Sequence, residues 1–343
     1  MRQLKSLTLR GFPIGNGKPN FATLTSLTEL DLSRTDIDSV SALSGLVNLR
    51  KLTLEGLRLR SLSPLSQLTR LEKLDLNSAG FPSLGVIAAC LKLRTLNLRG
   101  AYVSDISAVS KLRKLHSLNL SQCPVTDLTP LARARNLVRL SLAETKVADL
   151  GVLANLKKLE VLDLRACCKI GDFTPLKGLR QLRELDLGCS NVDDLECLIG
   201  LVNLHTLSLM DTCLSDLSAL KFLRRLRRLD LSEAELSIPS DTDGLFPSLT
   251  EFATDENSLD LTLDMPNLRK VFLSEDLLER YQTAKRSEKS SGYGYDSECE
   301  ESDDEDEEED EYEEIWDTLD LLESRSVDLR CHCADEVTWF TDI

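Results

Sequence analysis

The sequence is organised by an apolar phrase, LxxLxxLxL, that recurs about every 22 residues from Leu4 to at least Leu231. A fixed period of this length indicates repeat units that stack into a solenoid, because one unit alone is too small to bury its apolar face. An elongated scaffold of this kind favours binding over catalysis. The first leucines of the final LxL pairs are Leu7, Leu30, Leu52, Leu74, Leu96, Leu118, Leu140, Leu162, Leu185, Leu207 and Leu229.

Each unit combines two apolar periods. The alternation at Leu30 and Leu32 predicts a strand whose two leucines point inward. The three-residue spacing from Ile37 through Val40 to Leu43 predicts a short helical or 3₁₀ return on the opposite side. The repeated unit therefore predicts an α/β fold in which a curved parallel sheet forms the concave face and the returns form the convex face.

Units such as VTDLTPLARARNLVRLSLAET (125–145) resemble the short, 22-residue class of leucine-rich repeat found in phosphatase-1 regulatory subunits and bacterial internalins. The stretch CCKIGDFTPLKGLRQLRELDLGCSNV (167–192) resembles leucine-rich repeat proteins of parasitic protozoa. The resemblance covers residues 1 to about 275. It implies a leucine-rich repeat solenoid that binds proteins.

The formal net charge of −16 is concentrated in one part of the 343-residue chain. Residues 1–275 hold 35 Lys and Arg against 32 Asp and Glu, whereas residues 276–343 hold 6 against 25. We predict a solenoid over 1–275, with about eleven regular units and a C-terminal cap of degenerate units at 249–275. Phe252 and Val271 take the strand positions in those degenerate units.

The tail divides into two further segments. Residues 276–314 are rich first in Ser and Gly and then in acidic residues, so we expect them to be disordered. Within them, Ser297 and Ser302 have a Glu three residues later and are candidate phosphorylation sites. A repeat domain followed by an acidic run resembles acidic leucine-rich nuclear phosphoproteins, which implies histone binding. Residues 315–343 are amphipathic and act either as a docking peptide or as a segment that folds back on the solenoid.

One departure from the resembled families concerns the turn after each strand, where they place an Asn ladder. Here the position holds Thr35, Leu57, Ala79, Ala101, Cys123, Thr145, Cys167, Ser190, Thr212 and Ala234. Because Leu and Ala side chains form no hydrogen bond, the units from Leu57 to Ala101 should be less stable than the others.

Three sets of polar residues recur along the repeats. Six Asp residues precede the returns, where a carboxylate accepts free backbone amides: Asp105, Asp127, Asp149, Asp172, Asp194 and Asp216. A basic flank just before the strands is densest at Arg224, Arg225 and Arg227, and it serves either solubility or an acidic partner. The candidate partner-binding residues of the concave face are Arg99, Asn119, Arg139, Asp163, Arg165, Asp186, Arg228 and Asp230.

The sequence suggests no catalytic centre, metal site or cofactor. The three histidines lack a nearby nucleophile motif, and Cys331-His332-Cys333 lacks the ligand spacing of a structural zinc site. A net charge of +3 over 275 residues without interleaved aromatic residues disfavours nucleic acid. Free repeat cysteines and the absence of an apolar N-terminal run lead us to expect an intracellular protein outside the membrane, in the cytoplasm or else the nucleus.

We therefore predict a non-enzymatic adaptor for a protein partner. A phosphatase regulatory subunit and an acidic-tail binder of basic proteins such as histones are the alternatives. We expect a monomer unless the N-terminal strand, which has no polar cap before it, pairs with another chain.

Overall fold

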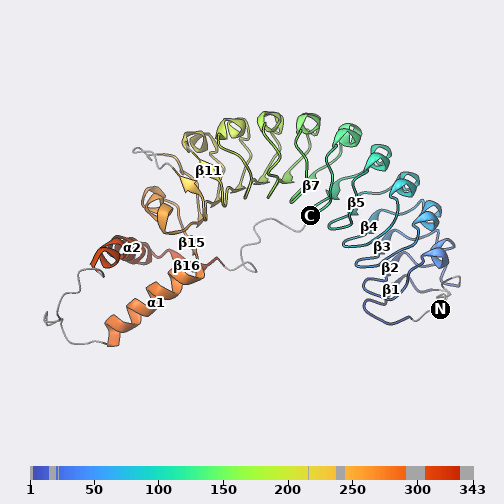
Figure 1. The fold of residues 1–343 in the computed structure, drawn as a ribbon, viewed down its shortest axis with the longest axis horizontal. Coiled ribbons are helices and arrows are strands. Elements are labelled where there is room, and N and C mark those ends of the chain that lie inside the picture. Colours follow the sequence, from blue (N-terminus) through green and yellow to red (C-terminus); the bar gives the residue numbers. More distant parts are fainter. Residues whose placement is uncertain are drawn as a thin grey trace.

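The computed structural model describes residues 3–14, 21, 23–214, 216–236, 244–290 and 306–332. Within these ranges, fourteen short strands form one parallel sheet that follows the inner side of an arc (Figure 1). The strands are β1 (Ser6–Thr8), β2 (Glu29–Asp31), β3 (Lys51–Thr53), β4 (Lys73–Asp75), β5 (Thr95–Asn97), β6 (Ser117–Asn119), β7 (Arg139–Ser141), β8 (Val161–Asp163), β9 (Glu184–Asp186), β10 (Thr206–Ser208), β12 (Arg228–Asp230), β14 (Glu251–Ala253), β15 (Lys270–Leu273) and β16 (Asp328–Cys331).

The returns lie on the outer rim of the arc and are 3₁₀ turns, as predicted (Figure 1). A second pair of short strands, β11 (Cys213–Leu214) and β13 (Glu235–Leu236), lies outside the main sheet. The 3₁₀ turns are η1 (Ser41–Leu43), η2 (Ser63–Gln67), η3 (Gly85–Ala89), η4 (Ser107–Lys111), η5 (Thr129–Arg133), η6 (Gly151–Asn155), η7 (Thr174–Gly178), η8 (Leu195–Leu198), η9 (Ser218–Phe222) and η10 (Glu256–Asp264).

The leucine phrase sets the register of the sheet. Leu30 is aligned with Leu52 in the next strand, and Leu52 with Leu74, so equivalent residues stack in rows. These leucines are buried in one continuous core that runs between the strands and the returns. The predicted α/β repeat solenoid is confirmed, and each added coil extends the same core. No helix in the described ranges is both long and apolar enough to cross a membrane.

The six Asp residues before the returns have the predicted role. Each carboxylate accepts a hydrogen bond from the backbone amide two residues later, at 2.7–2.8 Å. The bond from the amide of Ser107 lowers the pKa of Asp105, because it stabilises the ionised form. This row of carboxylates therefore shapes the turns. Among the described residues, no group of His, Cys, Asp or Glu could hold a metal ion.

Thiols and hydroxyls replace part of the missing Asn ladder. Cys123 donates through Sγ to the carbonyl of Leu98, and Cys167 donates to the carbonyl of Leu142, both at 3.0 Å. Each bond reaches the preceding coil. At Leu57 the link is instead made by backbone, since the amide of Gly80 donates to its carbonyl at 2.8 Å.

We expect backbone amides from Leu57 to Ala101 to exchange with deuterium faster than the equivalent amides from Cys123 to Ser190. The first stretch lacks side-chain bonds at the ladder position, so its turns open at a smaller free-energy cost. Hydrogen exchange followed by mass spectrometry measures the difference. Equal protection of the two stretches would show that backbone links such as Gly80 to Leu57 are sufficient.

The C-terminal end of the solenoid differs from the predicted cap. Phe252 and Val271 lie at strand positions as expected, but β14 and β15 are ordinary members of the sheet. The last strand of the described residues is β16, which pairs in parallel with β15 after an insertion of two helices, α1 (Glu275–Ser290) and α2 (Asp306–Ser324). The cap is therefore formed by α1, α2 and β16, and the assignment of the cap to 249–275 was wrong.

A second apolar core attaches this cap. Leu277 and Tyr281 of α1 and Leu319 and Leu322 of α2 pack with residues of η10, β15 and the segment before β16. Ile315 and Trp316 pack against the same core, as expected for the start of the amphipathic segment 315–343. Of the two interpretations left open for this segment, the structure selects the one in which it folds back onto the solenoid.

The predicted disordered segment needs a correction at both ends. Residues 276–290 belong to α1, because Leu277 and Tyr281 supply apolar groups that anchor a helix, and α2 begins at Asp306 within the acidic run. The predicted phosphorylation sites Ser297 and Ser302, and Cys333, lie outside the described residues. Cys331, by contrast, is described and is disulfide-bonded.

Candidate functional site

The sheet register brings the predicted concave residues into rows. Asn119, Asp163, Asp186 and Asp230 all take the third position of their strands and lie in one row with Ser141 and Ser208 between them. Arg139 and Arg228 take the first position of their strands and form a second row with the residues between them. Arg99 and Arg165 follow two residues after their strands.

The third-position residues have a structural role that the sequence prediction did not include. An oxygen of each side chain accepts the backbone amide two residues later, as in the pairs Asn119–Ser121, Asp163–Arg165, Asp186–Gly188 and Asp230–Ser232. Asn119, Asp186 and Asp230 are also buried, because neighbouring coils approach closely on the inner side of the arc. These three side chains terminate the strands and offer little surface to a partner.

Asp186 is the most perturbed carboxyl of the row. Burial, reinforced by the charge of Asp163, raises its pKa to about 7, although the amide of Gly188 opposes the shift. Ser141 donates to Oδ2 of Asp163 at 2.6 Å, so the neighbouring carboxylate is hydrogen-bonded. The middle of the concave face therefore changes charge near neutral pH.

Arginines are among the accessible groups of the concave face. Arg228 pairs with Glu251 at 2.9 Å, and Arg165 lies 3.8 Å from Glu144. Arg99 donates to Gln122 at 3.4 Å. All of these pairs are at least partly open to solvent, so a partner can compete for the guanidinium groups.

A second feature lies at the flank where the chain enters the strands. Arg224, Arg225 and Arg227, the predicted basic flank, line an open hollow of approximately 740 Å³. We call this the basic hollow. Its other lining residues are His205, Ser248, Thr250, Glu251, Asn267, Arg269 and Lys270. Sequence analysis had not included Arg269 or Lys270, because they lie in degenerate units that lack the leucine phrase.

Family models for leucine-rich repeats match residues 91–133 and 135–178 as paired copies, and residues 23–44 as a single repeat. An internalin (inlF) of Listeria monocytogenes has the same fold, with 28% sequence identity and a TM-score of 0.71 over 79% of this chain and 81% of the internalin chain. The chain is a leucine-rich repeat protein. No functionally curated protein matches its sequence.

Other solved leucine-rich repeat structures show the fold alone. A leucine-rich repeat protein of Leptospira interrogans is 24% identical with a TM-score of 0.68, covering 82% of this chain and 70% of its own. The plant peptide hormone receptor RGFR1, solved in complex with RGF2, is 21% identical with a TM-score of 0.56, covering 73% and 45%. Leucine-rich repeat domains are typically non-enzymatic scaffolds that bind proteins.

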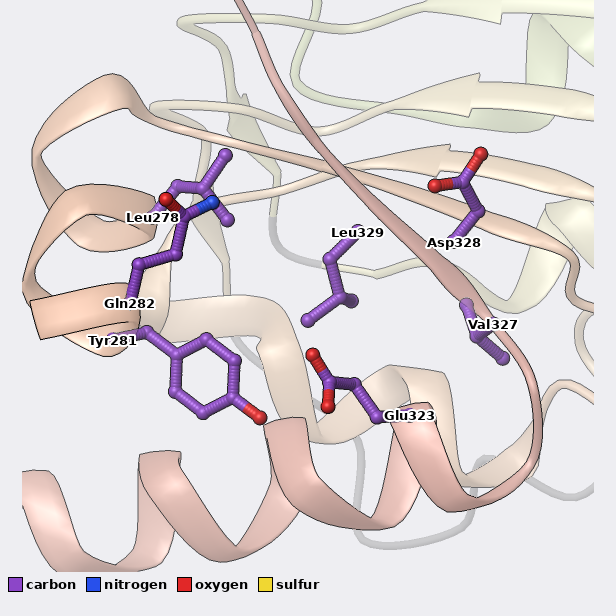
Figure 2. Close-up of a pocket in the computed structure, with 7 residues that line it drawn as sticks. All are labelled: Leu278, Tyr281, Gln282, Glu323, Val327, Asp328 and Leu329. Atoms are coloured by element: carbon purple, nitrogen blue, oxygen red, sulfur yellow. The ribbon is translucent and has the colours of Figure 1, made fainter. Parts of the chain in front are cut away.

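The cap of this leucine-rich repeat protein contains a smaller pocket of approximately 320 Å³ (Figure 2). Tyr281 of α1 donates to Oδ1 of Asp320 at 2.6 Å, and its ring stacks on Trp316 with the centroids 5.7 Å apart. Lys285 also bonds Asp320 at 3.0 Å and pairs with Glu323, which raises the pKa of Lys285. These contacts hold α1 against α2. The lining residues are Leu278, Tyr281, Gln282, Glu323, Val327, Asp328 and Leu329.

The residue after β16 returns to the concave face of the leucine-rich repeat sheet. Nε2 of His332 lies 3.6 Å from Oδ2 of Asp230. Asp230 belongs to β12, and β14 and β15 lie between β12 and β16 in the sheet. The nearby carboxylate of Asp230 raises the pKa of His332, while partial burial lowers it. The residue after β16 therefore lies against the inner side of the solenoid.

Proposed function

We propose that this protein is a non-enzymatic adaptor whose concave face binds a protein partner. The observation that carries the proposal is the continuous inner sheet, which exposes Arg99 and Arg165 among its polar side chains, while the carboxyl groups of the third position are engaged with backbone. Arginine is enriched among the residues that dominate binding energy in interfaces. A partner surface rich in carboxylates and backbone carbonyls suits such a face.

The test replaces Arg99, Arg139 and Arg165 with Glu in the full-length chain and captures partners from the source cell. We expect the captured partner to be lost, with a decrease in affinity of about tenfold or more for the purified pair. A control with Lys111, Arg133 and Lys177 replaced by Glu changes the same charge on the convex 3₁₀ turns. Retention by the concave variant and loss by the convex control would contradict the proposal.

The identity of the captured protein separates the finer alternatives. Selective retention of a phosphatase catalytic subunit would identify a phosphatase regulatory subunit. Salt-sensitive capture of histones that depends on the acidic run would identify a binder of basic proteins. Seven of the eight described cysteines are free thiols, which supports the proposal that the adaptor works in a reducing compartment inside the cell, whereas the disulfide-bonded Cys331 is the exception.

A further inference from the structure

The basic hollow concentrates positive charge that the described residues leave largely uncompensated. Glu251 is the one carboxylate among its lining residues, and it already pairs with Arg228 at 2.9 Å and with Lys270 at 3.5 Å. Over the described ranges, no carboxylate lies within ion-pair distance of the four remaining arginines, Arg224, Arg225, Arg227 and Arg269. Like charges gathered in this way repel one another unless an anion is present.

The floor of the hollow is held by hydrogen bonds between coils. Ser248 donates to the carbonyl of Arg224 at 2.9 Å, Thr250 to that of Arg227 at 3.1 Å, and Asn267 to that of Pro247 at 2.9 Å. These bonds fix the backbone from which the cationic side chains extend. A binding surface that is ordered in advance loses less entropy when a ligand binds.

Some cations elsewhere on the molecule have an ion-pair partner. Arg50 pairs with Glu72 at 2.9 Å, and Arg183 lies 3.5 Å from Glu160, so each has a carboxylate in an adjacent coil. Arg113, Lys114 and Arg135, on the same flank, also lie outside ion-pair distance of any described carboxylate. The hollow differs from that part of the flank in gathering four such arginines around one open cavity.

The shape and chemistry of the hollow select the kind of anion. Its lining residues come from the coils of β10, β12, β14 and β15, which at about 4.8 Å per strand extend over roughly 14 Å, the length of four or five extended residues. Guanidinium groups bind carboxylates through paired hydrogen bonds. The lining includes no Phe, Tyr or Trp on which nucleic-acid bases would stack, and no large apolar side chain that would enter a lipid surface.

We propose that the basic hollow binds a carboxylate-rich peptide segment of a partner protein. The lining of the site includes none of Arg99, Arg139 and Arg165 of the concave face, so it adds a second point of contact on the same scaffold. Two linked contacts of this kind raise the overall affinity for one partner, or allow two partners to be held together.

The test uses the full-length chain and a fluorescein-labelled hexapeptide of alternating Asp and Glu. Binding is followed by fluorescence anisotropy at about 50 mM and about 200 mM salt, because charge-driven binding weakens as salt rises. In the hollow variant, Arg224, Arg227 and Arg269 become Gln, which removes charge but keeps a long polar side chain. We expect a decrease in affinity of roughly tenfold or more at low salt.

Two controls make the result specific. Replacing Arg113, Lys114 and Arg135 with Gln removes the same charge from the same flank farther from the cap, and we expect less than about a twofold effect. The concave variant with Arg99, Arg139 and Arg165 replaced by Glu should bind the hexapeptide as the unmodified chain does. A result that contradicts peptide binding in the hollow can therefore be distinguished from a result that contradicts the adaptor proposal. Unchanged melting temperatures establish that the variants are folded.

Three results would overturn the inference. The first is equal loss of binding in the hollow variant and the flank control, which would mean general charge attraction. The second is tighter binding of a hexathymidine probe than of the hexapeptide. The third is a gain of about tenfold in hexapeptide affinity when the acidic residues of 298–305 are replaced by their amides, which would make this chain the source of the peptide.

Discussion

Replacing Leu319 with Ala is expected to lower the stability of the cap by about 2–5 kcal/mol, the usual cost of removing a large apolar side chain from a packed core. Leu319 is fully buried in the core that joins α1 and α2 to β15. The eleven-unit part of the solenoid has its own core, and neighbouring units interact only locally, so it should remain folded. The cap should therefore open first.

The same helix supplies the matched control. Leu321 is 40% exposed, so its replacement by Ala removes the same atoms with little loss of packing. Hydrogen exchange of the β16 amides and limited proteolysis between α1 and α2 report opening of the cap. If the two variants behave alike, Leu319 does not hold the cap in place.

Replacing Asp186 with Asn is expected to remove a pH-dependent loss of stability from the middle of the solenoid. The pKa of this carboxyl rises from 3.8 to about 7 on folding, chiefly through burial. Between these values the folded chain holds a proton that the unfolded chain has released, so stability falls as pH rises and levels off above the folded pKa. From about pH 5 to about pH 8 the loss is about 2–3 kcal/mol.

The side-chain oxygen of Asn can still accept the amide of Gly188, so the turn should survive the substitution. We expect the variant to melt at a higher temperature than the unmodified chain at about pH 8, with the difference shrinking at about pH 5. Asp31→Asn is the control, since Asp31 forms the equivalent bond to Ser33 in the second coil of the sheet. A pH dependence that is identical in the Asp186 variant and the unmodified chain would contradict the prediction.

Much of the solenoid was predictable because the apolar pattern that specifies it is local to each unit and repeats along the chain. The alternation at Leu30 and Leu32 specifies a strand, and the same phrase in every unit specifies the register of its neighbours. Phe252 and Val271 kept that register even where the phrase decays, because an apolar residue at the strand position is enough to continue the core.

The cap was not predictable by the same reasoning. Leu329 supplies the last strand position opposite Val271, yet no repeat phrase surrounds it, and two helices separate it from β15. Its pairing depends on the tertiary core around Leu319 and Leu322. This core also explains why a chain ending at Glu275 would be a poor isolated solenoid, since it would expose Val271 and Leu273.

The candidate sites were predictable only in part. Sequence places Arg224, Arg225 and Arg227 on one flank, but the hollow they share with Arg269 depends on how successive coils stack. Asp163 and Asp186 occupy equivalent positions in the phrase, and the burial that chiefly raises the pKa of Asp186 depends on the curved sheet. Sequence also does not show that Asn119 and Asp230 face backbone amides instead of solvent.

The late position of β16 has a consequence for synthesis. The 54 residues from 274 to 327 separate the end of β15 from the start of the strand that covers its edge. At ordinary elongation rates the ribosome needs roughly three to ten seconds to add them. Throughout that interval the nascent chain carries an uncovered parallel edge, which is a template for association with another nascent copy. Until β16 emerges, this edge of β15 is a surface that chaperones of nascent chains would need to cover.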